Sequence, residues 1–300
     1  MKVRISPSRK MFLLTNTILL GCISIICVLP FLHVLWASMS SPTKVQLHRG
    51  IILLPMDFTL KSYELVFSKD TLISGYRITL FVTGVGTAIS LLLTSLGAYV
   101  LANKSAMLNK FLLRFVTVTM FVSGGLIPFY LLVTTIGLNG SVWALILPYC
   151  LNTWNMLVMR ASFRTIPDSI EESTRIDGAS ELTILFRIVI PLSMPVVAVM
   201  ILFYALSYWN SWFPASLFIR RRELFPIQLT MRELLLLTQS STMLGTSAEI
   251  SSLGDEVGME NYVEMLKYTT IVVSTLPIIL VYPFLQKYFV KGILVGSLKE

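Results

Sequence analysis

Charged residues divide the chain into long apolar windows and short polar connections. A helix needs about 20 residues to cross the hydrocarbon core of a membrane, so each uncharged window of that length predicts a span. Five windows contain no Asp, Glu, Lys or Arg: 11–43, 78–103, 115–159, 188–219 and 268–286. The window 115–159 is long enough for two helices, with a turn at Gly137–Gly140 between them. The pattern predicts six spans, near 12–38, 76–101, 112–136, 142–162, 188–215 and 266–288.

The composition agrees with membrane insertion. Of the 300 residues, 55% are hydrophobic and only 13% are charged, and the mean hydropathy is +0.76. A soluble domain carries roughly twice this charged fraction, and ionised side chains are costly in hydrocarbon. The sequence therefore predicts one all-α membrane domain over residues 1–300. The net charge of +8 does not indicate a nucleic-acid partner, because the positive residues lie mostly at the ends of apolar segments.

The positions of lysine and arginine predict the orientation, because these residues favour the cytoplasmic side. They occur in the N-terminal segment (Lys2, Arg4, Arg9, Lys10), in the loop after the second span (Lys104, Lys110, Arg114) and at the C-terminus (Lys287, Lys291, Lys299). We therefore expect that the chain crosses the cell membrane several times and that both termini lie on the cytoplasmic side. The loop 164–190 is then cytoplasmic and the segment 216–265 is outside. The cluster Arg220–Arg222 opposes this placement, but long loops translocate largely regardless of charge.

Residues for catalysis or metal binding do not form a recognisable set. No Gly-x-x-x-x-Gly-Lys-[Ser/Thr] phosphate loop occurs, so ATP energy would have to come from a partner. The two histidines, His33 and His48, cannot assemble a metal cluster or a Ser-His-Asp set, and His33 is expected to be a satisfied interior residue. Cys22, Cys27 and Cys150 lie in apolar segments and are expected to be small buried hydrophobes. We expect no enzyme, no metal and no cofactor.

The insert 167–191 is polar, rich in charge and flanked by apolar segments. Asp168 followed by Glu171 predicts an N-cap with a capping box, and Gly178 suits the end of that helix. Ser180 can cap a second helix that runs into the fifth span. From these residues alone, a solvated interfacial hairpin and a docking element for a water-soluble partner are both open.

The spacing Glu172-x5-Gly178-x9-Ile188-x-Ile190-Pro191 resembles the EAA loop of ABC importer permeases. Ser173 and Thr174 stand where that pattern has two alanines, and Ile190 stands where it has leucine. In that family the first helix of the loop docks on a cytoplasmic ATPase. The resemblance therefore implies an ATPase-coupling role for five residues: Glu171, Glu172, Arg175, Asp177 and Gly178.

Four other segments are similar to the carbohydrate-uptake, maltose-type branch of that family: Leu126–Tyr130, Phe163–Asp168, Trp209-Asn210 and Tyr282–Gly292. The resemblance implies a type I permease fold that imports an oligosaccharide by ATP-driven alternating access. It implies as partners a second, non-identical permease, two cytoplasmic ATPase subunits and an extracytoplasmic solute-binding protein. The outer segment 216–265 is either a contact for that binding protein or a disordered loop.

Aromatic and amide side chains gather in the fourth and fifth predicted spans. Sugars are recognised by aromatic faces and amides, and asparagine in hydrocarbon needs a partner or water. Interfacial anchoring of the aromatic residues is the alternative. The candidate substrate-pathway residues are Asn152, Asn155, Tyr208, Trp209, Asn210 and Trp212. Two other functions are open: an ABC permease for a peptide or organic anion, and an ATP-independent carrier or channel, although no carboxylate lies within a span except near its ends.

Overall fold

The computed structural model describes residues 6–48, 50–68, 70–103, 108–244, 266–281 and 283. All regular structure within these residues is helical, which confirms the all-α prediction. The chain divides into two compact units, residues 1–69 with 233–276 and residues 70–232 with 277–300. The N-terminal charges at Lys2 and Arg4, Lys104 and the C-terminal lysines lie outside the described residues.

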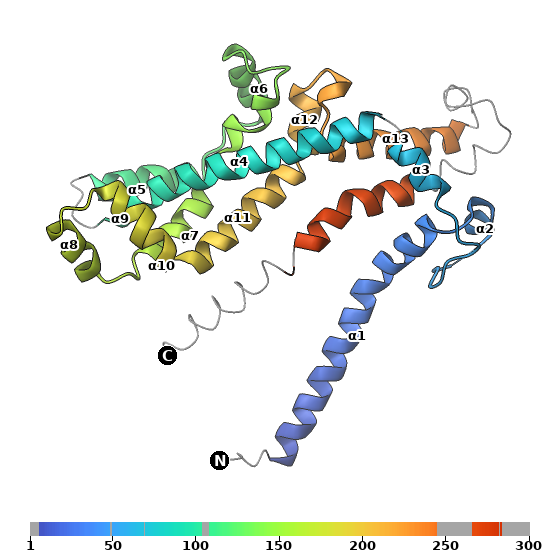
Figure 1. Ribbon diagram of the computed structural model, residues 1–300, viewed down its shortest axis with the longest axis horizontal. Helices are drawn as coiled ribbons and strands as arrows, with labels where there is room; N and C mark the ends of the chain where they lie inside the picture. Colours follow the sequence, from blue (N-terminus) through green and yellow to red (C-terminus); the bar gives the residue numbers. More distant parts are fainter. Residues whose placement is uncertain are drawn as a thin grey trace. The chain divides into compact units, whose positions relative to one another are not determined.

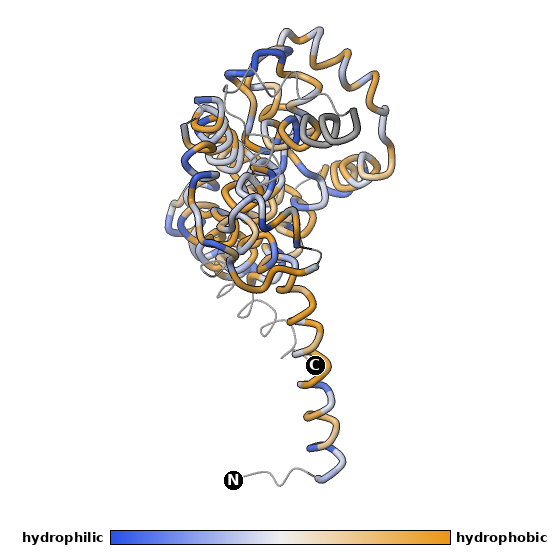
Figure 2. The backbone as a smooth tube through the Cα atoms, turned by 90° about the vertical axis from the view of Figure 1, so that its right-hand side faces the viewer, coloured by the Kyte–Doolittle hydropathy of each residue, from blue (hydrophilic) through white to orange (hydrophobic). Residues whose placement is uncertain are grey.

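The first unit contains α1 (Pro7–Ser38), α2 (Pro42–Leu47) and α3 (Lys61–Phe67), together with most of the helix Leu266–Val281. Helix α1 begins where the Ser6 hydroxyl accepts a hydrogen bond from Arg9 N. It is largely hydrophobic along its length (Figure 2) and its side chains are exposed over most of it. His33 Nδ1 accepts from Ile52 N at 3.0 Å, so the expectation of a satisfied histidine is confirmed.

The cysteines are less buried than expected. Cys22 and Cys27 are exposed on α1, and Cys150 is half-buried. The expectation of burial is therefore wrong for the two cysteines of α1, which lie among the exposed apolar side chains of that helix.

The second unit is built around α4 (Asp70–Ala102), which packs against α7 (Thr153–Phe163) and α11 (Met194–Trp209) (Figure 1). The other helices of this unit are α5 (Asn109–Val118), α6 (Leu126–Thr135), η1 (Val142–Leu145), η2 (Leu147–Tyr149), α8 (Asp168–Ile176), α9 (Glu181–Ile184), the π-helix η3 (Leu185–Val189), α10 (Ile190–Leu192), α12 (Trp212–Phe218) and η4 (Arg222–Leu224). Helix α13 (Ile227–Leu244) begins in this unit.

Small residues on one face of α4 bring α11 close to it. A Cβ at Gly86 would lie 2.8 Å from ring atoms of Tyr208, so only glycine fits under that ring. One and two turns further along, Ser90 Oγ lies 2.8 Å from the Tyr208 hydroxyl, and Thr94 Oγ1 lies 2.6 Å from the Tyr204 hydroxyl. Small residues that allow close backbones, with hydrogen bonds between helices, are the usual means of helix association in membranes.

Two of the predicted spans contain one long helix each. Helices α1 and α4 cover the ranges 12–38 and 76–101, and both are long and apolar enough to cross a membrane. Among the described residues, up to four spans qualify if each of two bent helix pairs counts as one. The helix Leu266–Val281 lies in the range 266–288, of which residues 282 and 284–288 lie outside the described residues.

Each of the other three ranges contains more than one helix. In 112–136, α5 and α6 are separated by a turn that ends at Gly125, whose φ is +83°. In 142–162, two short 3-10 helices meet α7 at a bend of 48°. In 188–215, the segment Glu181–Leu192 meets α11 at 90°, where Pro191 and Pro195 each lack the N–H that continues a helix.

The outer segment 216–265 also departs from expectation in its first half. A disordered loop is wrong there, because α13 occupies residues 227–244. Its first residue, Ile227, is fully buried and donates its N–H to Thr79 Oγ1 at 2.8 Å. Residues 245–265 lie outside the described part of the chain.

Candidate functional site

Helix α8 opens the polar insert and begins one residue earlier than predicted. Its N-cap is Pro167, with extended backbone angles (φ −61°, ψ 132°) and no side-chain oxygen. The predicted N-cap role of Asp168 is therefore wrong, as is the capping box with Glu171. Both carboxylates lie instead in the first turn, where negative charge is favourable to the helix dipole.

The end of α8 agrees with prediction. Gly178 has φ +83° and follows the C-cap Asp177. Its N–H donates to Arg175 O at 3.0 Å, and Ala179 N donates to Thr174 O at 3.2 Å, which is the Schellman pattern. A side chain at position 178 would be strained by this backbone conformation even though nothing lies within 4 Å of it.

The second helix of the insert also begins as predicted. Ser180 is the N-cap of α9, and its hydroxyl accepts from Thr183 N at 3.3 Å. Helix continues through the π-helix η3 and α10 to Leu192, and the chain then turns by 90° into α11. The π-helical turn directly precedes Pro191, so the irregular hydrogen bonding and the missing proline N–H occur together.

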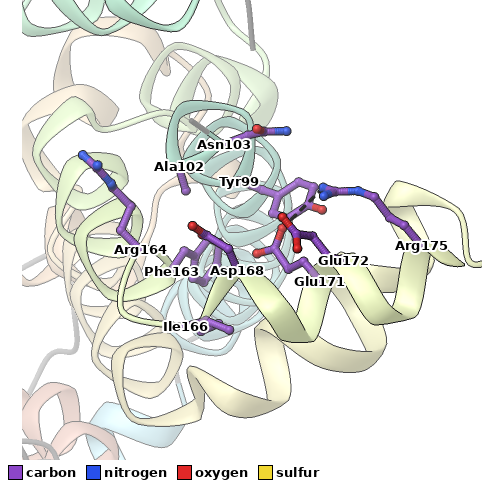
Figure 3. A pocket seen from close by; sticks show the side chains of 10 residues that line it. All are labelled: Tyr99, Ala102, Asn103, Phe163, Arg164, Ile166, Asp168, Glu171, Glu172 and Arg175. Atoms are coloured by element: carbon purple, nitrogen blue, oxygen red, sulfur yellow. Dashed lines mark hydrogen bonds and ion pairs between the residues drawn. The ribbon is translucent and has the colours of Figure 1, made fainter. Parts of the chain in front are cut away.

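A polar cavity of about 180 Å³ lies between the C-terminal ends of α4 and α7 and the face of α8. Phe163 and Ile166 give it an apolar wall, while Asp168 and Glu171 of α8 present carboxylates to it (Figure 3). Arg164 also lines the cavity, and its guanidinium points away from these carboxylates in Figure 3. The charged face of α8 therefore borders a polar cavity.

Arg175 connects the elements around this cavity. Its Nε donates to Glu181 Oε1 at 2.7 Å and its Nη2 to Glu181 Oε2 at 3.2 Å, which makes a two-point ion pair. Nη2 also lies 3.4 Å from Glu171 Oε2. The hydroxyl of Tyr99, near the end of α4, donates to Glu181 Oε2 at 2.5 Å. Arg175, and then Tyr99, lower the pKa of the Glu181 carboxyl below its usual range by hydrogen bonding, so it is ionised at neutral pH.

The five predicted coupling residues fall into two groups. Glu171 and Arg175 face the cavity and contact other residues of the insert. Glu172 also lines the cavity but is exposed, as are Asp177 and Gly178 at the end of α8.

Three residues that belong with this site were missed by sequence reasoning. Ile176 is 86% exposed on α8, and no periodic pattern marks so short a helix. Tyr99 and Glu181 are 82 residues apart in the chain, so no local signal pairs them. The Glu171–Arg175 contact could have been found, because i,i+4 pairs of opposite charge meet on a helix.

Three of the predicted pathway residues lie where α7 meets α11. Asn152 is the N-cap of α7 and accepts from Asn155 N at 3.0 Å. The backbone N–H of Asn152 donates to the Tyr204 hydroxyl at 3.3 Å. Asn155 and Tyr208 are both buried, and the Tyr208 hydroxyl donates to Ile146 O at 3.3 Å. These contacts give the three residues a part in holding α7 and η1 on α11.

The other three predicted pathway residues, Trp209, Asn210 and Trp212, lie at the end of α11 and the start of α12. Trp209 is 6% exposed, whereas Asn210 is exposed and its Nδ2 donates to Leu206 O at 2.9 Å. The guanidinium of Arg232 lies 3.6 Å from the ring centroid of Trp212, an arrangement that places a cation on the aromatic face.

Comparisons with known proteins agree on one family. The model of the family "binding-protein-dependent transport system inner membrane component" matches residues 90–295. The polygalacturonan/rhamnogalacturonan transport system permease protein YtcP of Bacillus subtilis is 42% identical over 92% of this chain and 94% of its own length. The arabinooligosaccharides transport system permease protein AraQ of the same organism is 25% identical over 99% of both chains.

A solved structure is also similar in three dimensions. It is the crystal structure of a bacterial ABC transporter involved in the import of the acidic polysaccharide alginate. One of its chains superposes with a TM-score of 0.85 and 30% sequence identity, covering 95% of this chain and 99% of that chain.

Proposed function

The chain belongs to the family of inner membrane components of binding-protein-dependent transport systems, and from this premise we propose that it carries an oligosaccharide across the cytoplasmic membrane. It is an ABC importer permease, a transport subunit and not an enzyme. The match over residues 90–295, which includes the whole polar insert, is the observation that carries the proposal. ATP hydrolysis is assigned to separate cytoplasmic subunits, and transport to alternating access.

Reconstitution of the assembled complex in liposomes tests this function. Uptake of a labelled oligosaccharide is expected to require ATP, the solute-binding protein and this chain together. Uptake that persists without ATP would favour a carrier or channel. Transport of labelled peptides in place of sugars would favour an ABC permease for another solute.

We propose that the polar insert and the outer arginines lie on opposite sides of the membrane, with six spans and both termini inside. The geometry of α4 supports this placement. Thr79 contacts Ile227 near the arginine-bearing segment, and Tyr99 contacts Glu181 in the insert. These 20 positions along one helix correspond to about 30 Å, which is the thickness of the hydrocarbon core.

Cysteine labelling checks this topology. In a variant without Cys22, Cys27 and Cys150, a cysteine at Ser173 is expected to react with an impermeant reagent only from the cytoplasmic side. A cysteine at Arg221 is expected to react only from outside. Labelling of both from the same face would contradict the topology.

We propose the exposed face of α8 as the surface that docks on the ATPase. Glu172 offers a charge to a basic partner residue, and Ile176 offers an apolar side chain that is 86% exposed. Asp177 and Gly178 shape the end of the same helix. The remaining partners follow from the family: a second, non-identical permease, two ATPase subunits and a solute-binding protein outside.

For the cargo we propose an acidic oligosaccharide. Arg220, Arg221 and Arg222 are exposed on the segment that we place outside, although arginine generally favours the cytoplasm. Arg232 lies on the face of Trp212, a predicted pathway residue. Uronate carboxylates and sugar rings are the groups that arginine and aromatic faces recognise. Two similar proteins support this choice, one named for polygalacturonan and one for the acidic polysaccharide alginate.

Removing the charge of Arg232 tests the proposal that the cargo is acidic. Arg232→Gln is expected to raise the concentration for half-maximal uptake of a galacturonate oligomer by an amount equivalent to about 1.5–3 kcal/mol, because a charged hydrogen-bond partner is lost. Uptake of a neutral oligomer of the same length should not show this loss. The control is Arg187→Gln, an exposed arginine of the cytoplasmic insert. Equal loss for acidic and neutral cargo would contradict the proposal.

Within the membrane we propose that Asn152, Asn155, Tyr208, Trp209, Asn210 and Trp212 border the substrate pathway. The exposure of Asn152 and Asn210 supports direct contact with cargo or water. The buried Tyr208 and Trp209 would act by holding α11 in place.

A further inference from the structure

Arg175 of α8 and Tyr99 of α4 both donate hydrogen bonds to the carboxylate of Glu181 in α9. Arg175 donates to both carboxylate oxygens and the Tyr99 hydroxyl donates to one of them. The phenol of Tyr99 is largely buried, with 8% of the residue exposed. Exposed single ion pairs contribute little to stability, but paired Arg–carboxylate geometry within a network is the exception.

The elements on both sides of the Glu181 carboxylate are held by further hydrogen bonds. The end of α4 is held by Arg160 of α7, whose Nε donates to Leu101 O at 2.8 Å. Next to α8, Gly178 and Ser180 set the turn into α9 by backbone and capping hydrogen bonds. Thus α8 is joined to α9 by a short structured turn and to α4 through Glu181.

We propose that Tyr99, Arg175 and Glu181 are positioning residues that hold α8 on the end of α4, so that a partner displacing α8 moves α4 with it. Since α4 packs along α11 through the Ser90–Tyr208 and Thr94–Tyr204 hydrogen bonds, the displacement reaches the membrane-embedded core. This extends the proposed docking of α8 on an ATPase and rests on it. Arg175 thereby acts through the chain's own carboxylates and not as a docking residue.

The first experiment needs no partner. Hydrogen exchange is followed in the full chain in lipid nanodiscs for the unmodified protein, Tyr99→Phe and Glu181→Gln. Peptides covering α8 are expected to exchange about threefold faster or more in each variant, the scale of coupling within one hydrogen-bonded network. The double variant should exchange little faster than either single one. Arg187→Gln, which removes one charge from the same insert, should leave α8 unchanged.

The second experiment separates positioning from docking in the assembled complex. Tyr99→Phe and Glu181→Gln should keep the ATPase subunits bound, while the amount of sugar moved per ATP hydrolysed falls about threefold or more. A purely structural loss of complex would lower both activities together and leave this ratio unchanged. If the unmodified chain binds no ATPase, the proposed function fails. The hydrogen-exchange experiment still tests the positioning role of Tyr99, Arg175 and Glu181 in that case.

Two results would overturn the positioning role. One is unchanged exchange in α8 for both Tyr99→Phe and Glu181→Gln. The other is an unchanged ratio of sugar to ATP in complexes that contain these variants at normal stoichiometry.

Discussion

Glu172→Ala is expected to weaken association with the ATPase subunits by about 2–5 kcal/mol and to abolish transport with it. The physical reason is that a basic group of the partner would stay partly buried without its counter-charge. Glu172 is exposed on α8, so its loss should not unfold the chain. Co-purification of the ATPase at equal membrane expression, followed by sugar uptake, measures both effects.

Two variants serve as controls for this prediction. Ser169→Ala changes an exposed position of the same helix without removing charge and should leave association unchanged. Trp209→Ala, at a predicted pathway residue, should keep the ATPase bound and lower transport only. If Glu172→Ala retains full ATPase association and full uptake, the docking role of α8 is wrong.

Gly86→Ala is expected to destabilise the chain by about 1–3 kcal/mol, the cost of overpacking a filled core. The added Cβ would lie 2.8 Å from the Tyr208 ring. That ring is held by hydrogen bonds to Ser90 and Ile146, so it cannot move aside without breaking them. Thermal unfolding in detergent micelles measures the change.

The matched control lies two residues earlier on the same helix. A Cβ added at Gly84 would have nothing within 4 Å of it, so Gly84→Ala should not destabilise the chain and should stabilise the helix by about 0.5–1 kcal/mol. At Gly97 the Cβ would meet the end of the Met156 side chain, which is flexible enough to yield. Equal destabilisation at positions 84 and 86 would show that the contact with Tyr208 is not the cause.

Local signals in the sequence predicted local structure well. Gly178 and Ser180 act through hydrogen bonds to residues at most five positions away, so their neighbours in sequence are enough to predict them. The error at Asp168 was one residue, because the restricted backbone of Pro167 already sets the start of α8. The all-α class followed from the uncharged windows, since only a helix of that length satisfies its backbone in lipid.

The angles between helices and the long-range contacts could not be predicted from the sequence. Charge counting cannot tell a straight helix from one bent by 90° at Ser193, because both are equally apolar. The prolines at 191 and 195 marked an interruption but carried no angle. In the same way, the partners of Tyr99 and Tyr208 lie 82 and 118 residues away, and only the packed fold brings them together.

The bend at Ser193 makes α11 a lever arm for rotation of the segment Glu181–Leu192. Because the segment Glu181–Leu192 runs at 90° to α11, a rotation of that segment about its own axis swings α11 as an arm. The 16 residues of α11 span about 24 Å at 1.5 Å per residue. A rotation of about 10° at the bend would carry the far end, at Trp209, sideways by about 4 Å. Because the neighbouring Tyr208 is hydrogen-bonded to Ser90 of α4 at 2.8 Å, a movement of this size at the end of α11 requires that α4 move with it.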